Sequence, residues 1–156
     1  MRQSREWKKH LRQNVRELHR AMILSCDDLM LSIFDEQLGD KHQLIHQKAV
    51  AYLFNQAVEL VSIDVNVVLD FGFWSKTERR EAQKYFSDRG IVAELHYMNA
   101  PDVQIKQQLQ MRKLEIKRGD SKAYYIEDEM QNYLDSKFEE PTDDEGSAWV
   151  NFVRVF

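Results

Sequence analysis

The segment VNVVLDFGFWS, at residues 65–75, decides the fold class. Its first half is β-branched and almost wholly apolar, which is typical of a strand that is covered on both faces in a parallel sheet. The strand runs into Asp70, and the glycine-containing stretch behind it turns the chain. Ser75 then begins a polar helix, for which Gly90 is a natural C-terminal stop. We therefore predict a strand over residues 65–69 and a helix from Ser75 to Gly90.

Strands and helices alternate outward from that segment. Upstream, the apolar run from Ala21 to Ser25 predicts a buried strand, and the apolar residues of 50–61 follow helical spacing. Downstream, Ile91 to Met98 predicts another buried strand, and Trp149 to Phe156 predicts a last one. This alternation is typical of βαβ units with right-handed crossovers, so we predict an α/β fold with a mainly parallel sheet.

The composition describes an ordinary folded domain. Of the 156 residues, 43% are hydrophobic and 31% charged, with five Gly and two Pro, which excludes collagen-like and largely disordered chains. No apolar run approaches the ~18 residues that span a bilayer. The basic start has no apolar stretch behind it and is not a secretory signal. Cys26 is the only cysteine, which excludes an internal disulfide and fits a reducing compartment. We expect one cytoplasmic domain without membrane association.

Charge is unevenly distributed along the chain. Residues 1–20 carry seven Lys or Arg and two acids, whereas residues 127–145 carry nine acids and one Lys. Solvated helix faces and an acidic loop explain both segments. The net charge of −4 argues against a general nucleic-acid binder.

Two predicted strands end in acids. The strand from Ala21 runs into Asp27 and Asp28, and the strand from Val65 runs into Asp70. Ligands of parallel sheets sit beyond the carboxyl ends of the strands, so these acids are candidate site residues. A structural alternative exists for each: Asp27 or Asp28 can cap the next helix, and Asp70 can accept local N–H groups.

Several strings of the sequence occur together in one bacterial family. They are SCDDL at 25–29, VVLDFGFW at 67–74, Arg79-Arg80, ELHY at 94–97 and FEEPT at 138–142. With them the chain resembles the ATP-binding P-loop kinase-like proteins related to polynucleotide kinase, zeta toxin and chloramphenicol phosphotransferase. The resemblance implies a P-loop NTPase-like, three-layer αβα fold. It also implies phosphoryl transfer from Mg-ATP to a hydroxyl of a small molecule or nucleotide.

The same resemblance assigns roles to residues at the strand ends. Asp27 matches the acid that accepts the proton of the attacking hydroxyl, and Asp70 matches an acid near magnesium or the substrate. Phosphoryl transfer needs such a positioned base. Trp74 is an anchor of the core or the loop, or alternatively a wall of the substrate pocket.

The resemblance also implies a basic lid at about residues 110–126. Its members are Arg112, Lys117 and Arg118, which match groups that close over the ATP phosphates and suit charge spread over phosphate oxygens. A solvated helix face is the alternative. Arg79 and Arg80 match more weakly a substrate-recognition role. Met30 stands where related polynucleotide kinases carry an arginine, which argues against a nucleic-acid 5′-hydroxyl as substrate.

The start of the chain departs from the family. No G-x-x-x-x-G-K-[ST] phosphate loop is present, and no Gly precedes Gly39. The first, central strand and the phosphate loop are therefore missing. Either residues 1–156 are an N-terminally truncated P-loop kinase-like domain, which we favour because the acids and the lid arginines remain, or the loop was lost. In the second case the chain is a non-catalytic remnant that binds a partner, or itself, through an exposed sheet edge.

Two further signals are weaker. His42 and His46 share a helix face at the spacing of zinc ligands, but no third ligand accompanies them. Cys26 has no adjacent His, so we interpret it as a small buried residue and not as a nucleophile.

Overall fold

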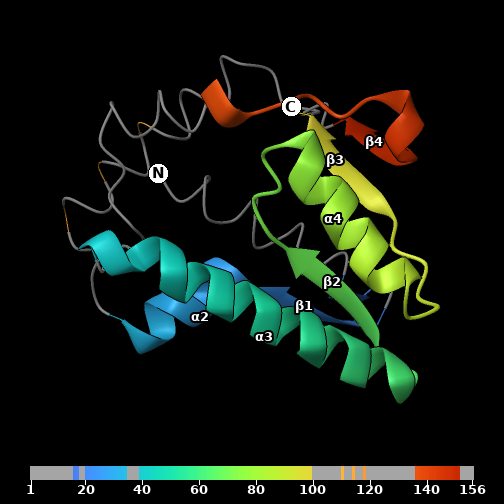
Figure 1. The fold of residues 1–156 in the computed structure, drawn as a ribbon, viewed down its shortest axis with the longest axis horizontal. Coiled ribbons are helices and arrows are strands. Elements are labelled where there is room, and N and C mark those ends of the chain that lie inside the picture. The colour runs from blue at the N-terminus through green and yellow to red at the C-terminus, as the bar shows by residue number, and fades with distance from the viewer. Residues whose placement is uncertain are drawn as a thin grey trace. The chain divides into compact units, whose positions relative to one another are not determined.

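The computed structural model describes residues 16–17, 20–34, 39–99, 110, 114, 118 and 136–151, and Figure 1 draws their elements. Residues 152–156 of the predicted final strand lie outside the described residues. Of the predicted lid region, the structure describes only residues 110, 114 and 118. No helix in the described ranges is long and apolar enough to cross a membrane.

The chain divides into two compact units. The first comprises Met1–Gly72 and Gly119–Tyr124, and the second comprises Phe73–Arg118 and Tyr125–Phe156. Two compact units are compatible with one domain or with two, so the single domain over residues 1–156 stays a prediction. Each unit is described by itself below.

The first unit contains a two-stranded parallel sheet. Strands β1 (Ala21–Ser25) and β2 (Asn66–Asp70) pair in register from Ala21 opposite Asn66 to Ser25 opposite Asp70. The first strand has the predicted bounds, and the second lies one residue further along than predicted, because Asp70 itself belongs to the strand. A parallel pair requires a long crossover, which helices α2 and α3 supply here.

Helix α3 provides most of the crossover. Helix α2 (Cys26–Ile33) follows β1 directly, the 3₁₀ helix η1 (Gly39–Lys41) comes next, and α3 (His42–Ser62) leads back to β2. Helix α3 packs against α2 and both strands, and Figure 1 shows it running across the pair. Its buried residues Leu53 and Ala57 are one turn apart, as helical spacing predicts.

The predicted cap of α2 was wrong. Ser25 is the N-cap, and its hydroxyl accepts a hydrogen bond from the Asp28 backbone N–H at 3.3 Å. Asp27 and Asp28 lie inside the first turn. Serine is as good a cap as aspartate, and it stands at the last strand residue, where the backbone is still extended. The capping function that competed with a chemical role for Asp27 thus belongs to Ser25.

The burial of β2 also differs from the prediction. Val67, Val68 and Leu69 are only half-buried in the structure, although their β-branched run suggested a strand covered on both faces. The segment is apolar and forms a strand, as predicted. Within the described residues, the sheet of the first unit contains only β1 and β2, and α3 packs against it.

The second unit contains a second parallel pair. Helix α4 (Lys76–Ser87) precedes β3 (Leu95–Asn99), and the 3₁₀ helix η2 (Asp143–Glu145) precedes β4 (Ser147–Asn151). Leu95 pairs with Ser147 and Asn99 with Asn151. Strand β3 begins four residues later than predicted, because residues 91–94 form an irregular segment in which Val92 is 91% exposed.

Helix α4 begins at the predicted cap Ser75 and ends three residues before the predicted stop at Gly90. Ser75 and Glu78 form a reciprocal capping box, in which each side chain accepts a hydrogen bond from the other's backbone N–H. The last helical residue is Ser87, and Gly90 follows at φ +72°. The strands of both described sheets are parallel, and α2 and α3 connect β1 to β2, so the α/β class is confirmed. The three-layer arrangement stays a prediction.

Candidate functional site

The predicted acids of the first unit lie at one edge of its sheet. Ser25 and Asp70 are register partners at the carboxyl ends of β1 and β2. Asp27 follows Ser25 by two residues, in the first turn of α2. We call Asp27 and Asp70, which follow or end these two strands, the carboxylate edge. Asp27 is exposed and Asp70 is half-buried, so this edge presents carboxylates to solvent.

Asp27 has no structural partner among the described residues. Its carboxylate makes no hydrogen bond or ion pair within the ranges that the structure describes, and Ser25 already caps the helix. The first turn of a helix favours a negative charge, because the backbone N–H groups there point toward it. The position therefore tolerates an ionised, exposed carboxylate that is available to a ligand.

Cys26 adjoins Asp27, but its thiol is unreactive. Its side chain is buried at 2% exposure. Burial, and to a smaller extent the neighbouring charge of Asp27, raise the pKa of the thiol to about 11. Because the thiolate is the nucleophilic form, a thiol with this pKa is unreactive near neutral pH. The interpretation of Cys26 as a small buried residue fits this geometry.

An aromatic contact holds the chain behind Asp70. Phe71 stacks on Phe54 of α3, with ring centroids 5.7 Å apart and ring planes inclined by 11°. A stack of this kind contributes about 1 kcal/mol beyond its buried area. Two contacts thus fix the position of Asp70: the pairing of β2 with β1, and the stacking of the next residue, Phe71, on α3.

Trp74 belongs to the second unit and has well-defined contacts there. Its backbone N–H donates to Glu78 Oε2 at 2.9 Å, and its carbonyl accepts from the Glu139 N–H at 2.8 Å. The half-buried ring meets the Phe138 ring edge-on at 6.3 Å. The alternative that Trp74 anchors a loop therefore has structural support, which does not exclude a ligand on the exposed part of the ring.

The suggested substrate role of Arg79 was wrong. The Arg79 side chain is 1% exposed and forms a bidentate ion pair with Glu145, through Nε to Oε2 at 2.7 Å and Nη2 to Oε1 at 3.1 Å. Arg80 is exposed and pairs with Asp144 at 2.8 Å. Both arginines thus hold the acidic segment that the charge pattern assigned to a solvated loop, because α4 supplies the matching cations.

Glu145 is the residue of this unit that sequence reasoning missed. A signal was present: Thr142 precedes Glu145 by three residues, which is the capping-box pattern, and this box is formed. Arg79 and Thr142 together lower the pKa of the Glu145 carboxyl to about 2. The exposed Asp144 carboxyl also has a lowered pKa, because Thr142, Lys76 and Arg80 donate hydrogen bonds to it.

The predicted lid is described at few positions. Arg112 and Lys117 lie outside the described residues. Arg118 is exposed, and its backbone N–H donates to the Leu114 carbonyl at 3.1 Å, which is one helical turn. The role of all three residues stays a prediction.

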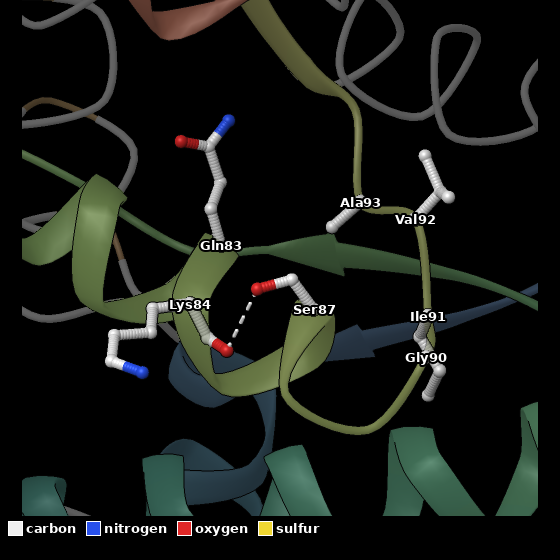
Figure 2. Close-up of a pocket in the computed structure, with 7 residues that line it drawn as sticks. All are labelled: Gln83, Lys84, Ser87, Gly90, Ile91, Val92 and Ala93. Carbon is white, nitrogen blue, oxygen red and sulfur yellow. Dashed lines mark hydrogen bonds between the residues drawn. The ribbon is translucent and has the colours of Figure 1, made fainter.

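Two other places in the described residues carry no site. The rings of His42 and His46 stack at 6.3 Å on α3, but no group of three metal ligands occurs in the described ranges. A hollow of about 410 Å³ lies between the end of α4 and residues 90–93, and Figure 2 draws the residues that line it. Lys84 at its rim pairs with Asp88, and the Ser87 hydroxyl donates to the Lys84 carbonyl, so neither is directed at a ligand.

Comparison with known proteins gives one match. The family model described as an AAA domain matches residues 7–139, which is most of the chain. No curated protein and no solved structure matches the sequence. The family has a P-loop NTPase-like fold and generally binds ATP with Mg²⁺.

The described residues fit the magnesium part of that ligand. Mg²⁺ is bound through one or two carboxylates together with phosphates and water, and the carboxylate edge offers the exposed Asp27 and the half-buried Asp70 at the ends of two paired strands. The phosphates are bound in P-loop proteins by a glycine-rich loop, and no such loop occurs in the sequence. Within residues 1–156, the basic residues predicted for the lid are the candidates for phosphate binding.

Proposed function

The chain belongs to the AAA domain family, and from this premise we propose that it transfers a phosphoryl group from Mg-ATP to a hydroxyl of a small molecule or nucleotide. One observation carries the proposal. The register of β1 and β2 brings the strand-end acids Asp27 and Asp70 to one edge of a parallel sheet, where ligands of α/β proteins bind.

Asp27 is the base of the proposed reaction. Its exposed carboxylate accepts the proton of the substrate hydroxyl, which makes the oxygen a better nucleophile. Mg-ATP, when bound, supplies the γ-phosphoryl group that this oxygen accepts, with ADP as the other product. The rigid helix start keeps Asp27 in place, because the Ser25 cap fixes the backbone on either side of it.

The family resemblance suggests a role for Asp70 and, separately, roles for residues of the second unit. Asp70 would hold Mg²⁺ or orient the hydroxyl, and its place at the end of β2 makes it the better fixed of the two acids. Arg112, Lys117 and Arg118 would bind the phosphates, since guanidinium and ammonium groups stabilise their charge. Trp74 would border the acceptor substrate.

A paired substitution tests the base. We expect Asp27→Asn to lower the rate of phosphoryl transfer by about 100- to 10,000-fold, which is the usual contribution of a general base. Asp28→Asn is the matched control, because it removes the same charge from the same helix turn. The assay follows ADP formation from Mg-ATP with a panel of hydroxyl compounds, beside circular dichroism for folding. Equal rates in the two variants would remove Asp27 from the role of base.

A second candidate function rests on the half-buried β2. Val67, Val68 and Leu69 form an apolar strand that is incompletely covered in the described residues, and Met22 of β1 is an exposed large hydrophobic residue. Such a sheet would bind a strand of a partner or of a second copy. Size-exclusion chromatography with light scattering tests self-association. A concentration-dependent dimer that Val68→Lys abolishes would support it, and a monomer at all concentrations would contradict it.

A further inference from the structure

A buried ion pair lies in the second unit, outside the proposed chemistry. Arg79 Nε and Nη2 bind the two carboxylate oxygens of Glu145, and the side chains are 1% and 0% exposed. Burying two charges costs several kcal/mol each in desolvation, so such a pair contributes little net stability compared with apolar residues of the same volume. Its presence calls for an explanation beyond stability.

The pair is extended by further hydrogen bonds on both sides. Glu145 Oε1 also accepts the Thr142 backbone N–H at 2.9 Å, and the Glu145 carbonyl accepts Gln83 Nε2 at 3.0 Å. The remaining terminal nitrogen of Arg79, Nη1, donates to the carbonyls of Phe73 and Trp74 at 3.2 and 3.3 Å. One guanidinium thus joins η2 to the loop that carries Trp74.

Four contacts hold Trp74, one of them from Arg79. Its carbonyl accepts from Arg79 and from the Glu139 N–H, and its own N–H donates to Glu78. Its ring rests edge-on against Phe138. Two of these contacts come from residues 136–146 and two from α4, so the orientation of the indole depends on α4 and this segment staying joined.

We propose that Arg79 is a positioning residue for Trp74: its planar guanidinium, fixed by Glu145, sets the backbone and therefore the ring that borders the acceptor substrate. The contribution to substrate binding rests on the proposed function of Trp74. Only arginine fits this role, because its fork binds a carboxylate along one edge and carbonyls from the other nitrogen, whereas the single ammonium of lysine cannot do both.

The test uses Trp74 as its own reporter. The chain has three tryptophans, so Trp7→Phe with Trp149→Phe leaves Trp74 as the sole emitter in the full chain. In that background we expect Arg79→Lys to shift the emission maximum to longer wavelength, raise quenching by acrylamide and lower anisotropy, while far-UV circular dichroism is unchanged. Arg80→Lys is the matched control, because Arg80 pairs with Asp144 at the surface, and we expect it to change none of these quantities.

A second control separates positioning from general loosening. Ala82 is buried on α4, and Ala82→Gly weakens this helix without touching the ion pair. We expect it to lower the urea midpoint but to leave the Trp74 signature as in the parent. If Arg79→Lys does not fold, Glu145→Gln, which keeps the shape and removes the charge, must give the same red shift. An unchanged signature in the folded Arg79 or Glu145 variant, or the same signature in Ala82→Gly, would overturn the proposal.

The two proposals fail separately in this design. The fluorescence signature needs no nucleotide, so it reports on positioning whether or not Mg-ATP binds. Where transfer is measurable, Arg79→Lys should raise the KM of the acceptor and leave the KM of Mg-ATP unchanged. A moved signature without any Mg-ATP binding would sustain the positioning role and remove the kinase function. Intact phosphoryl transfer with an unchanged Trp74 signature would sustain the kinase function and remove the positioning role.

Discussion

The two units use their acids in different ways. In the first, Asp27 is exposed at a strand end and has no ion-pair partner among the described residues. In the second, Glu145 is buried against Arg79, and Asp144 lies between Lys76 and Arg80. The difference teaches that the supply of cations from α4 decides which acids hold structure. Asp27, for which the described residues supply no such cation, is the acid for which we propose a chemical role.

The largest expected effect comes from breaking the buried pair. Glu145→Ala leaves the Arg79 charge buried and unpaired, so we expect it to lower the free energy of unfolding by about 3–5 kcal/mol. Asp27→Ala removes an exposed acid without an ion pair and should stay within about 0.5 kcal/mol of the parent. Urea unfolding followed by circular dichroism measures both. A loss of similar size in the two variants would erase the distinction between structural and chemical acids.

A pH series sharpens the same comparison. The pKa of Glu145 in the folded state is about 2, lowered chiefly by the hydrogen bonds from Arg79. The ordinary pKa of glutamate is near 4.3. Because the folded-state pKa is lower, ionised Glu145 stabilises the fold at pH values above about 4.3, and this contribution is lost as the pH falls toward 2. We expect urea midpoints of the parent to fall over this window. In Glu145→Gln the fall should be smaller, and an identical pH dependence would show that Glu145 does not carry the effect.

The smallest expected effect concerns how the long helix of each unit ends. Both α3 and α4 end in a pair of backbone bonds typical of the Schellman motif, with Asp64 at φ +62° in one and Gly90 at φ +72° in the other. Glycine adopts this backbone region without strain and aspartate does not. We expect Asp64→Gly to raise the free energy of unfolding by about 0.5 kcal/mol and Gly90→Ala to lower it by about 1 kcal/mol.

Urea midpoints again measure these changes. Asp64→Asn is the control, because asparagine tolerates this backbone region better than most residues and should fall between the parent and Asp64→Gly. A destabilising Asp64→Gly would mean that the aspartate side chain contributes more than its backbone strain costs.

Local signals predicted much of the fold. The apolar run at Ala21–Ser25 gave the strand within its observed bounds, and the Ser75 cap gave the start of α4. These features depend on neighbouring residues, which a sequence displays directly. The cap of α2 was misassigned to Asp27 or Asp28, because Ser25 and both acids are all good capping residues and the observed strand end selects among them.

Contacts between distant residues could not be predicted in the same way. Arg79 and Glu145 are 66 positions apart, and an arginine in a polar helix gives no sign that its side chain will be buried. The pairing of Ser25 with Asp70 was anticipated only as a common edge, since parallel strands align their carboxyl ends. The burial of β2 depends on which other elements pack against it. This is a tertiary property that a β-branched run does not encode.

Calorimetric titration of Mg-ATP into the full chain tests the central claim most directly. The account predicts saturable binding at one site per chain, lost when Mg²⁺ is chelated, weakened by Asp70→Asn and unchanged by Asp144→Asn. These two substitutions remove one carboxylate charge each, from the carboxylate edge and from the structural cluster respectively. No binding heat, or equal weakening by the two substitutions, would contradict the assignment of magnesium binding to the carboxylate edge.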